Sequence, residues 1–99
     1  MPTFVSTITF TEQGITSIQD TTKRAAGFKS AAKKMGIKVN DMLWCLGPFD
    51  GLLTFEAPDA QSATALMLQL SAKGNVKTQT AQAFTAAEME KVLAAAGGK

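Results

Sequence analysis

The fold of this chain is decided by one stretch, residues 44–56, which reads Trp44-Cys45-Leu46-Gly47-Pro48-Phe49-Asp50-Gly51-Leu52-Leu53-Thr54-Phe55-Glu56. Its centre holds two turn-forming pairs, Gly47-Pro48 and Asp50-Gly51, because proline presets φ, glycine reaches positive φ and aspartate bonds nearby backbone amides. The residues on either side are apolar, and those after Gly51 alternate in the manner of a strand with one buried face. We therefore predict a β-hairpin with its turn near Pro48.

The chain before the hairpin has the pattern of a strand, a connector, a helix and a second strand. Residues 3–10 alternate with a period of two, which predicts a strand. Between Thr22 and Met35, apolar residues recur at spacings of three and four, which predicts an amphipathic helix that ends at Gly36. The connector, residues 11–20, has room for one helical turn. Residues 39–46 form the second predicted strand.

The chain after the turn repeats this pattern. A strand over residues 52–57 is followed by a helix that Asp59 caps and Gly74 ends, and then by a strand over residues 76–84. A further short helix is predicted because Thr85 and Glu88 have the spacing of a capping box. The order β-α-β-β-α-β, with an extra C-terminal helix, predicts an α+β, ferredoxin-like fold. In that fold both main helices cover one face of a four-stranded antiparallel sheet.

The first strand predicts the character of both sheet faces. Phe4, Ser6, Ile8 and Phe10 share the face that we assign to the core, and the other face carries Thr3, Val5, Thr7 and Thr9. We expect the second face also to include Leu52, Thr54, Val76, Thr78 and Thr80. Such a face is too apolar for an ordinary solvated surface, which favours a two-fold symmetric homodimer that buries it. The alternative is a monomer whose threonine-rich sheet faces water.

The sequence resembles the GYD domain family of small proteins, which are named for a Gly-Tyr-Asp motif. The residues that carry this resemblance span most of the chain: Met1-Pro2-Thr3-Phe4-Val5, residues 10–15, Lys23-Arg24, Trp44, Gly47-Pro48-Phe49-Asp50, residues 56–59, Gly74-Asn75-Val76 and Ala83-Phe84-Thr85. The resemblance implies a single GYD-like domain over residues 1–99 and assembly as a dimeric α/β barrel. The family is of unknown biochemical function. Phe49 departs from its motif and lacks the phenolic hydroxyl.

Composition excludes several classes of site. The 99 residues have a net charge of +2 and no run of basic residues longer than Lys33-Lys34, so we expect no nucleic-acid binding. The single cysteine excludes an internal disulfide, and the absence of histidine excludes a Ser-His-Asp triad. The carboxylates lack metal-ligand spacing, and we expect neither a metal nor a cofactor. We find no signal peptide or membrane-spanning run and predict a cytoplasmic protein without membrane contacts.

Four residues are candidates for a ligand-binding or active site: Arg24, Trp44, Phe49 and Asp50. Asp50 has the carboxylate that a general base needs, but an aspartate in a turn also bonds the turn's own backbone. Trp44 offers a ring for stacking on an apolar ligand, although a lone tryptophan in a strand is commonly a packing residue. Arg24 either binds an anion or forms a salt bridge on the surface of its helix.

Two functions remain open from the sequence. The first is a non-catalytic homo-oligomer that binds a small apolar ligand or a protein partner through its sheet face or barrel rim. The second is a cofactor-free isomerase or oxygenase-like enzyme acting on a carbonyl compound, with Asp50 as general base and Trp44 shaping the pocket. The sequence favours the first, because histidine and tyrosine are both absent from the chain.

Overall fold

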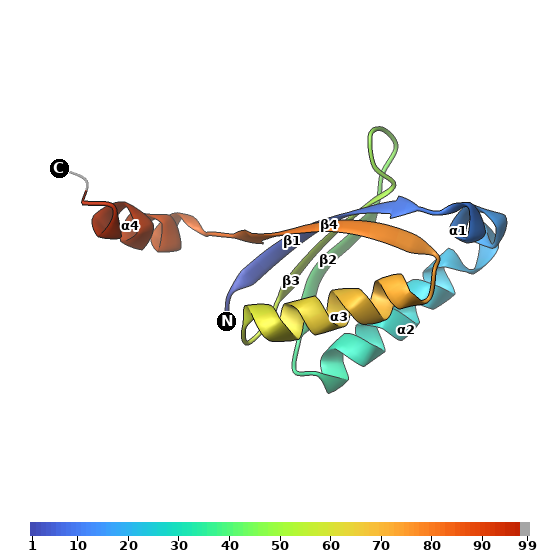
Figure 1. Cartoon of the computed structure of the whole chain (residues 1–99), viewed down its shortest axis with the longest axis horizontal. Coiled ribbons are helices and arrows are strands. Elements are labelled where there is room, and N and C mark those ends of the chain that lie inside the picture. The colour runs from blue at the N-terminus through green and yellow to red at the C-terminus, as the bar shows by residue number, and fades with distance from the viewer. Residues whose placement is uncertain (98–99) are drawn as a thin grey trace.

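The computed structural model describes residues 1–97 and has the predicted element order. The elements are β1 (Thr3–Phe10), α1 (Glu12–Thr16), the 3-10 turn η1 (Ile18–Asp20), α2 (Thr21–Lys34), β2 (Lys38–Trp44), β3 (Gly51–Glu56), α3 (Ala60–Ala72), β4 (Val76–Ala83) and α4 (Ala86–Ala95). The strands form one antiparallel sheet in the order β2-β3-β1-β4. Helices α2 and α3 both lie on one side of it (Figure 1). The predicted α+β, ferredoxin-like fold is confirmed.

Strands β2 and β3 form the predicted hairpin, with residues 45–50 as the connecting loop. The amide of Cys45 donates to the carbonyl of Asp50 over 2.8 Å and closes the loop. Gly47 has φ +144°, a value that residues with a side chain rarely adopt. The loop projects beyond the sheet (Figure 1), and Leu46 within it is fully exposed. Cys45, which we predicted inside the second strand, is instead a half-buried free thiol in this loop.

The hydrophobic core lies between the helices and the face of the sheet that they cover. The rings of Phe4 and Phe55 stack there with their centroids 5.4 Å apart. Each fully buried large apolar side chain stabilises the fold by about 1.5–3 kcal/mol. The other buried apolar side chains of this core are Phe28, Ala32, Ile37, Leu53, Ala57, Ala63, Leu66 and Met67.

The pairing of β1 with its neighbours corrects our assignment of β4. Directly opposed residues of an antiparallel pair lie on the same face. Val76 pairs with Phe10, Thr78 with Ile8 and Thr80 with Ser6, and the hydroxyl of Thr80 donates to that of Ser6 over 2.9 Å. The predicted placement of Val76, Thr78 and Thr80 on the second face is therefore wrong. The alternation of β4 is too weak to reveal its orientation without the register of its partner.

We call the opposite side of the sheet the open face, since no helix covers it within residues 1–97 (Figure 1). It mixes apolar and polar side chains, and the hydroxyl of Thr54 donates to the carboxylate of Asp41 over 2.7 Å. Leu43 on this face is largely exposed. The open face is formed by Thr3, Val5, Thr7 and Thr9 of β1, Leu52, Thr54 and Glu56 of β3, Asp41 and Leu43 of β2, and Lys77, Gln79, Ala81 and Ala83 of β4.

Phe84, Thr85 and helix α4 form an arm that continues β4 past the end of the sheet (Figure 1). The predicted capping box is confirmed: the amide of Glu88 donates to the Thr85 hydroxyl, and the amide of Thr85 donates to the Glu88 carboxylate. The arm gives the molecule an extended shape of 53 × 31 × 18 Å. No helix in the described part of the chain is long and apolar enough to cross a membrane.

Candidate functional site

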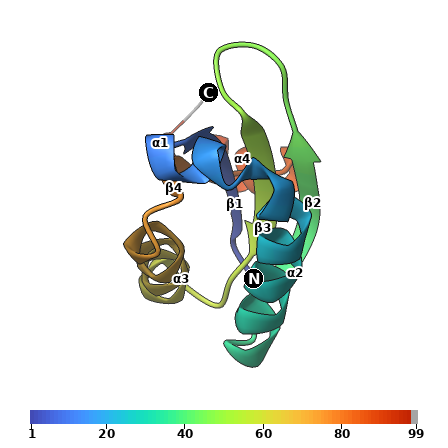
Figure 2. The same cartoon turned by 90° about the vertical axis from the view of Figure 1, so that its right-hand side faces the viewer.

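A cavity of about 180 Å³ lies between α2, α3 and the covered face of the sheet; we call it the helix-side cavity. Figure 2 shows the ribbons of α2 and α3 separated from each other on the same side of the sheet, and side chains of both helices line the cavity. Its wall is mainly apolar and includes Ile8, Phe10, Ala25, Phe28, Ala31, Met42, Leu66, Leu70 and Val76. Its polar lining residues are Thr21, Arg24, Asp50, Gln69, Lys73 and Asn75.

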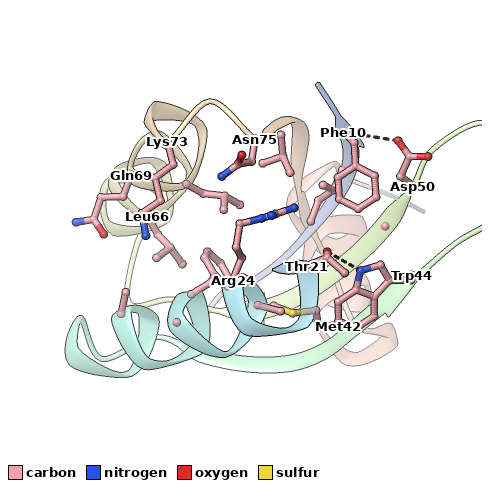
Figure 3. Close-up of a pocket in the computed structure, with 18 of the residues that line it drawn as sticks. Phe10, Thr21, Arg24, Met42, Trp44, Asp50, Leu66, Gln69, Lys73 and Asn75 are labelled. Atoms are coloured by element: carbon pink, nitrogen blue, oxygen red, sulfur yellow. Dashed lines mark hydrogen bonds between the residues drawn. The ribbon is translucent and has the colours of Figure 1, made fainter. Parts of the chain in front are cut away.

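Three of the four predicted site residues line this cavity: Arg24, Trp44 and Asp50 (Figure 3). They come from α2, from the end of β2 and from the hairpin loop, so the fold brings together residues that are far apart in the sequence. The fourth candidate, Phe49, lies half-buried in the same loop and is not part of the cavity wall.

Asp50 connects the hairpin loop to β1. Its amide donates to the carbonyl of Ile8, and its carboxylate Oδ2 accepts from the amide of Phe10, each over 2.8 Å. The side chain therefore bonds backbone, as the turn interpretation expected, but the backbone belongs to a neighbouring strand. The Phe10 contact engages Oδ2, and Oδ1, like any carboxylate oxygen, can accept a further hydrogen bond.

Arg24 is half-buried. One of our two interpretations expected it to form a salt bridge on the surface of its helix, but the guanidinium instead bonds residues that precede the helix. Its Nη1 donates to the carbonyl oxygen of Ser17 over 2.7 Å and lies 3.4 Å from the hydroxyl of that residue. Its Nη2 donates to the carbonyl of Gly14 over 3.4 Å. All three partners are neutral oxygens, so these bonds hold the guanidinium in place without neutralising its charge.

Trp44 stands at the rim of the cavity, about half exposed. Its indole Nε1 donates to the hydroxyl of Thr21 over 3.0 Å, which fixes the ring against the start of α2 (Figure 3). The geometry agrees with Trp44 as a packing residue, because its N–H is hydrogen-bonded within the fold. It also agrees with Trp44 as a stacking residue, because the ring borders an apolar space.

A sequence model of the GYD domain matches residues 4–93. The chain belongs to the GYD domain family. In this GYD domain, the Gly47-Pro48-Phe49-Asp50 segment forms the hairpin loop, and its aspartate anchors that loop to the first strand.

A curated relative of this GYD domain is the "Glutamine synthetase and cystathionine beta-lyase binding protein" of Thermus thermophilus. The two are 31% identical over 90 residues, which cover 90% of this chain and 95% of the relative. Among solved structures, an ACT domain protein from Streptococcus pneumoniae matches with a TM-score of 0.49 and 16% identity, over 83% of this chain and 89% of that one.

The sequence did not reveal the contacts that join residues 11–14 to residues 73–75, next to the cavity residue Asn75. The hydroxyl of Thr11 donates to the carbonyl of Gly74 over 2.6 Å, and Nε2 of Gln13 donates to the side-chain oxygen of Asn75 over 2.9 Å. A side chain on Gly14 would collide with the carbonyl of Asn75. The available signal was Gly14 itself, because a glycine inside a short helix needs a packing reason. Asn75, which stands just before β4, also lines the cavity.

The described residues contain no group of histidine, cysteine, aspartate and glutamate side chains arranged to hold a metal ion. The site itself combines an apolar space with a fixed guanidinium and, at its edge, the carboxylate of Asp50.

Proposed function

We propose that this GYD domain is a homodimeric, non-catalytic module that binds a protein partner. One observation carries the dimer: the arm exposes four large apolar side chains that residues 1–97 leave uncovered. Phe84 is 52% exposed, Met89 43%, Val92 40% and Leu93 49%. Clustered apolar exposure of this kind is typical of an interaction surface. We propose that a second copy covers both the arm and the open face.

The areas of the arm and the open face support a dimer interface that includes both surfaces. The sheet has four strands of six to eight residues and presents roughly 19 by 20–26 Å, or about 400–500 Å². A stable interface buries about 800 Å² on each partner, so the open face alone is small for a lasting dimer. The arm, with a helix about 15 Å long, supplies additional apolar area. In a two-fold dimer each arm would extend over the other subunit.

The hairpin loop is the surface that we propose for the protein partner. It projects from the sheet (Figure 1) and carries the fully exposed Leu46, two residues after Trp44 at the end of β2. The Thermus thermophilus relative is named for binding glutamine synthetase and cystathionine beta-lyase. By analogy with that name, we propose an enzyme of one of these two kinds as the partner of this chain.

Calorimetric titration of the purified chain against the glutamine synthetase and the cystathionine beta-lyase of the same organism tests the proposal. We expect at least one enzyme to bind and Leu46→Asp to weaken that binding at least tenfold, because a buried apolar contact is replaced by a charge. Ile15→Asp is the matched control, since Ile15 is also exposed but lies on α1. Failure of both enzymes to bind, or equal losses in the two variants, would contradict the proposed partner and its site.

A second candidate function is favoured by the shared position of Arg24, Trp44 and Asp50 around one cavity. It is the cofactor-free isomerase or oxygenase-like enzyme, in which Oδ1 of Asp50 takes a proton from the carbon beside a carbonyl group. Exchange of that proton for deuterium can be followed by NMR with phenylpyruvate as the probe. Exchange that wild type catalyses and Asp50→Asn loses, with the sheet intact, would favour the enzyme over the non-catalytic module.

A further inference from the structure

We infer that the helix-side cavity is a binding site for a small monocarboxylate with an apolar body, such as an aromatic or branched aliphatic acid. This site lies on the opposite side of the sheet from the proposed dimer interface. It therefore stands on different residues from the proposed dimer interface, and either can fail without the other.

The size and lining of the cavity select the body of the ligand. A dry apolar cavity of about 150 Å³ is large enough to bind benzene in another protein. The helix-side cavity, at about 180 Å³, has space for one ring or one branched chain and a short polar extension. Its wall of Phe28, Ala31, Leu66 and Leu70 offers no hydrogen bonds to a polar body.

The charge of the cavity selects the head group. Arg24 and Lys73 bring two positive charges to its lining, and Asp50 brings one negative charge. Figure 3 shows the guanidinium of Arg24 pointing to the middle of the cavity, whereas Asp50 lies at the edge beside Phe10. The carboxylate of Asp50 is held by the Phe10 amide over 2.8 Å. The central charge that a ligand meets is therefore that of Arg24.

The guanidinium of Arg24 is held ready for an anion. An arginine has five N–H donors in a rigid fork that matches a carboxylate, and the bonds to Gly14 and Ser17 use only part of this set. Because α1 and η1 hold the group from one side, a ligand would not need to order the side chain on binding. Less loss of side-chain freedom favours affinity.

Trp44 provides a direct measurement. It is the sole tryptophan of a chain without tyrosine, and it borders the cavity, so its fluorescence reports on this site in the purified protein. The probe is phenylacetate, and the neutral phenylacetamide of nearly the same shape is its control. We expect phenylacetate to change the fluorescence saturably and to bind about tenfold more tightly than phenylacetamide, since a hydrogen bond to a charged group is stronger than one between neutral groups.

Two variants of α2 test the location. Ala31→Met places extra atoms in the cavity and is expected to abolish phenylacetate binding, whereas Ala26→Met, on the exposed part of the same helix, is expected to leave it unchanged. Arg24→Met is expected to remove the preference for phenylacetate over phenylacetamide while the ring still binds. NMR shifts on titration should centre on Ala31, Leu66 and Leu70.

Three results would overturn the inference. The first is the absence of any saturable change with phenylacetate in folded wild type. The second is equal affinity for phenylacetate and phenylacetamide, which would remove the role of Arg24. The third is a set of NMR shifts centred on the open face, which would move the ligand to the other side of the sheet.

Discussion

Helices α3 and α4 both carry apolar side chains at helical spacing, but those of α3 are largely buried and those of α4 are exposed. On α3, Leu66 is 1% exposed and Met67 8%, because they pack against the sheet. On α4, Val92 is 40% exposed and Leu93 49%. The same kind of sequence pattern is therefore satisfied by the chain's own sheet in one helix and left uncovered in the other. This difference is the reason for proposing that α4 is completed by a second copy.

The largest effect on stability is expected from a substitution among the buried apolar residues of α3. Leu66→Ala should lower the free energy of unfolding by about 3 kcal/mol, because it removes a buried side chain beside an existing cavity. Leu93→Ala should change it by less than about 0.5 kcal/mol in dilute protein, where α4 has no partner. Urea unfolding at several protein concentrations measures both. A loss of similar size from Leu93→Ala at the lowest concentration would mean that α4 packs on its own chain.

A pair of glycine substitutions is expected to have a smaller effect on stability and tests the packing of α1 against residues 74–75. Gly14→Ala should destabilise the fold by about 1–3 kcal/mol, because the new Cβ meets the carbonyl of Asn75 and the backbone must move. Gly27→Ala, in α2, meets nothing within 4 Å and should stabilise the fold by about 0.5–1 kcal/mol through helix propensity. Equal thermal shifts in the two variants would contradict the packing of α1 against residues 74–75.

The smallest effect is expected from lowering the pH, which weakens the N-terminal caps of both helices but is expected to unwind only α4. The backbone amide of Thr85 donates to Glu88 and lowers the pKa of that carboxyl from 4.5; the amide of Ser62 likewise lowers the pKa of Asp59 from 3.8. Because the folded pKa is the lower one, each cap is fully effective above the unfolded value and is lost as pH falls through the folded value. Helix α4 should fray on acidification while the packed α3 persists.

Carbon chemical shifts of residues 60–72 and 86–95, recorded from about pH 6 to about pH 3, follow both helices separately. In Glu88→Gln the pH dependence of α4 should shrink, and Glu90→Gln on the same helix is the matched control. Loss of both helices at the same pH would show that packing does not distinguish them.

The fold was accessible from sequence because its signals are local. The turn residues Gly47-Pro48, the glycine after α2 and the Thr85 capping box all act within a few residues of where they stand. The face of β4 was predicted wrongly because Thr and Gln suit either side of a sheet, and only pairing with β1 decides it. The register of a strand is a long-range property.

The candidate site was predictable only in part for the same reason. Trp44 and Asp50 stand out as residue types within the hairpin, and Arg24 was named with them. Their meeting at one cavity depends on how α2 crosses the sheet, which no local pattern encodes. The bonds from Thr11 and Gln13 to residues 73–75 join positions about 60 apart in the chain and left no sequence signal beyond Gly14.

The most direct test of the account is light scattering during size-exclusion chromatography, over a range of protein concentrations, on wild type and on the double variant Met89→Asp/Leu93→Asp. The account predicts a wild-type dimer and a variant monomer that keeps its sheet and the helices α2 and α3, because the changed side chains lie only on the arm. A wild type that is monomeric at every concentration, or a variant that remains dimeric, would contradict the claim that a second copy covers α4.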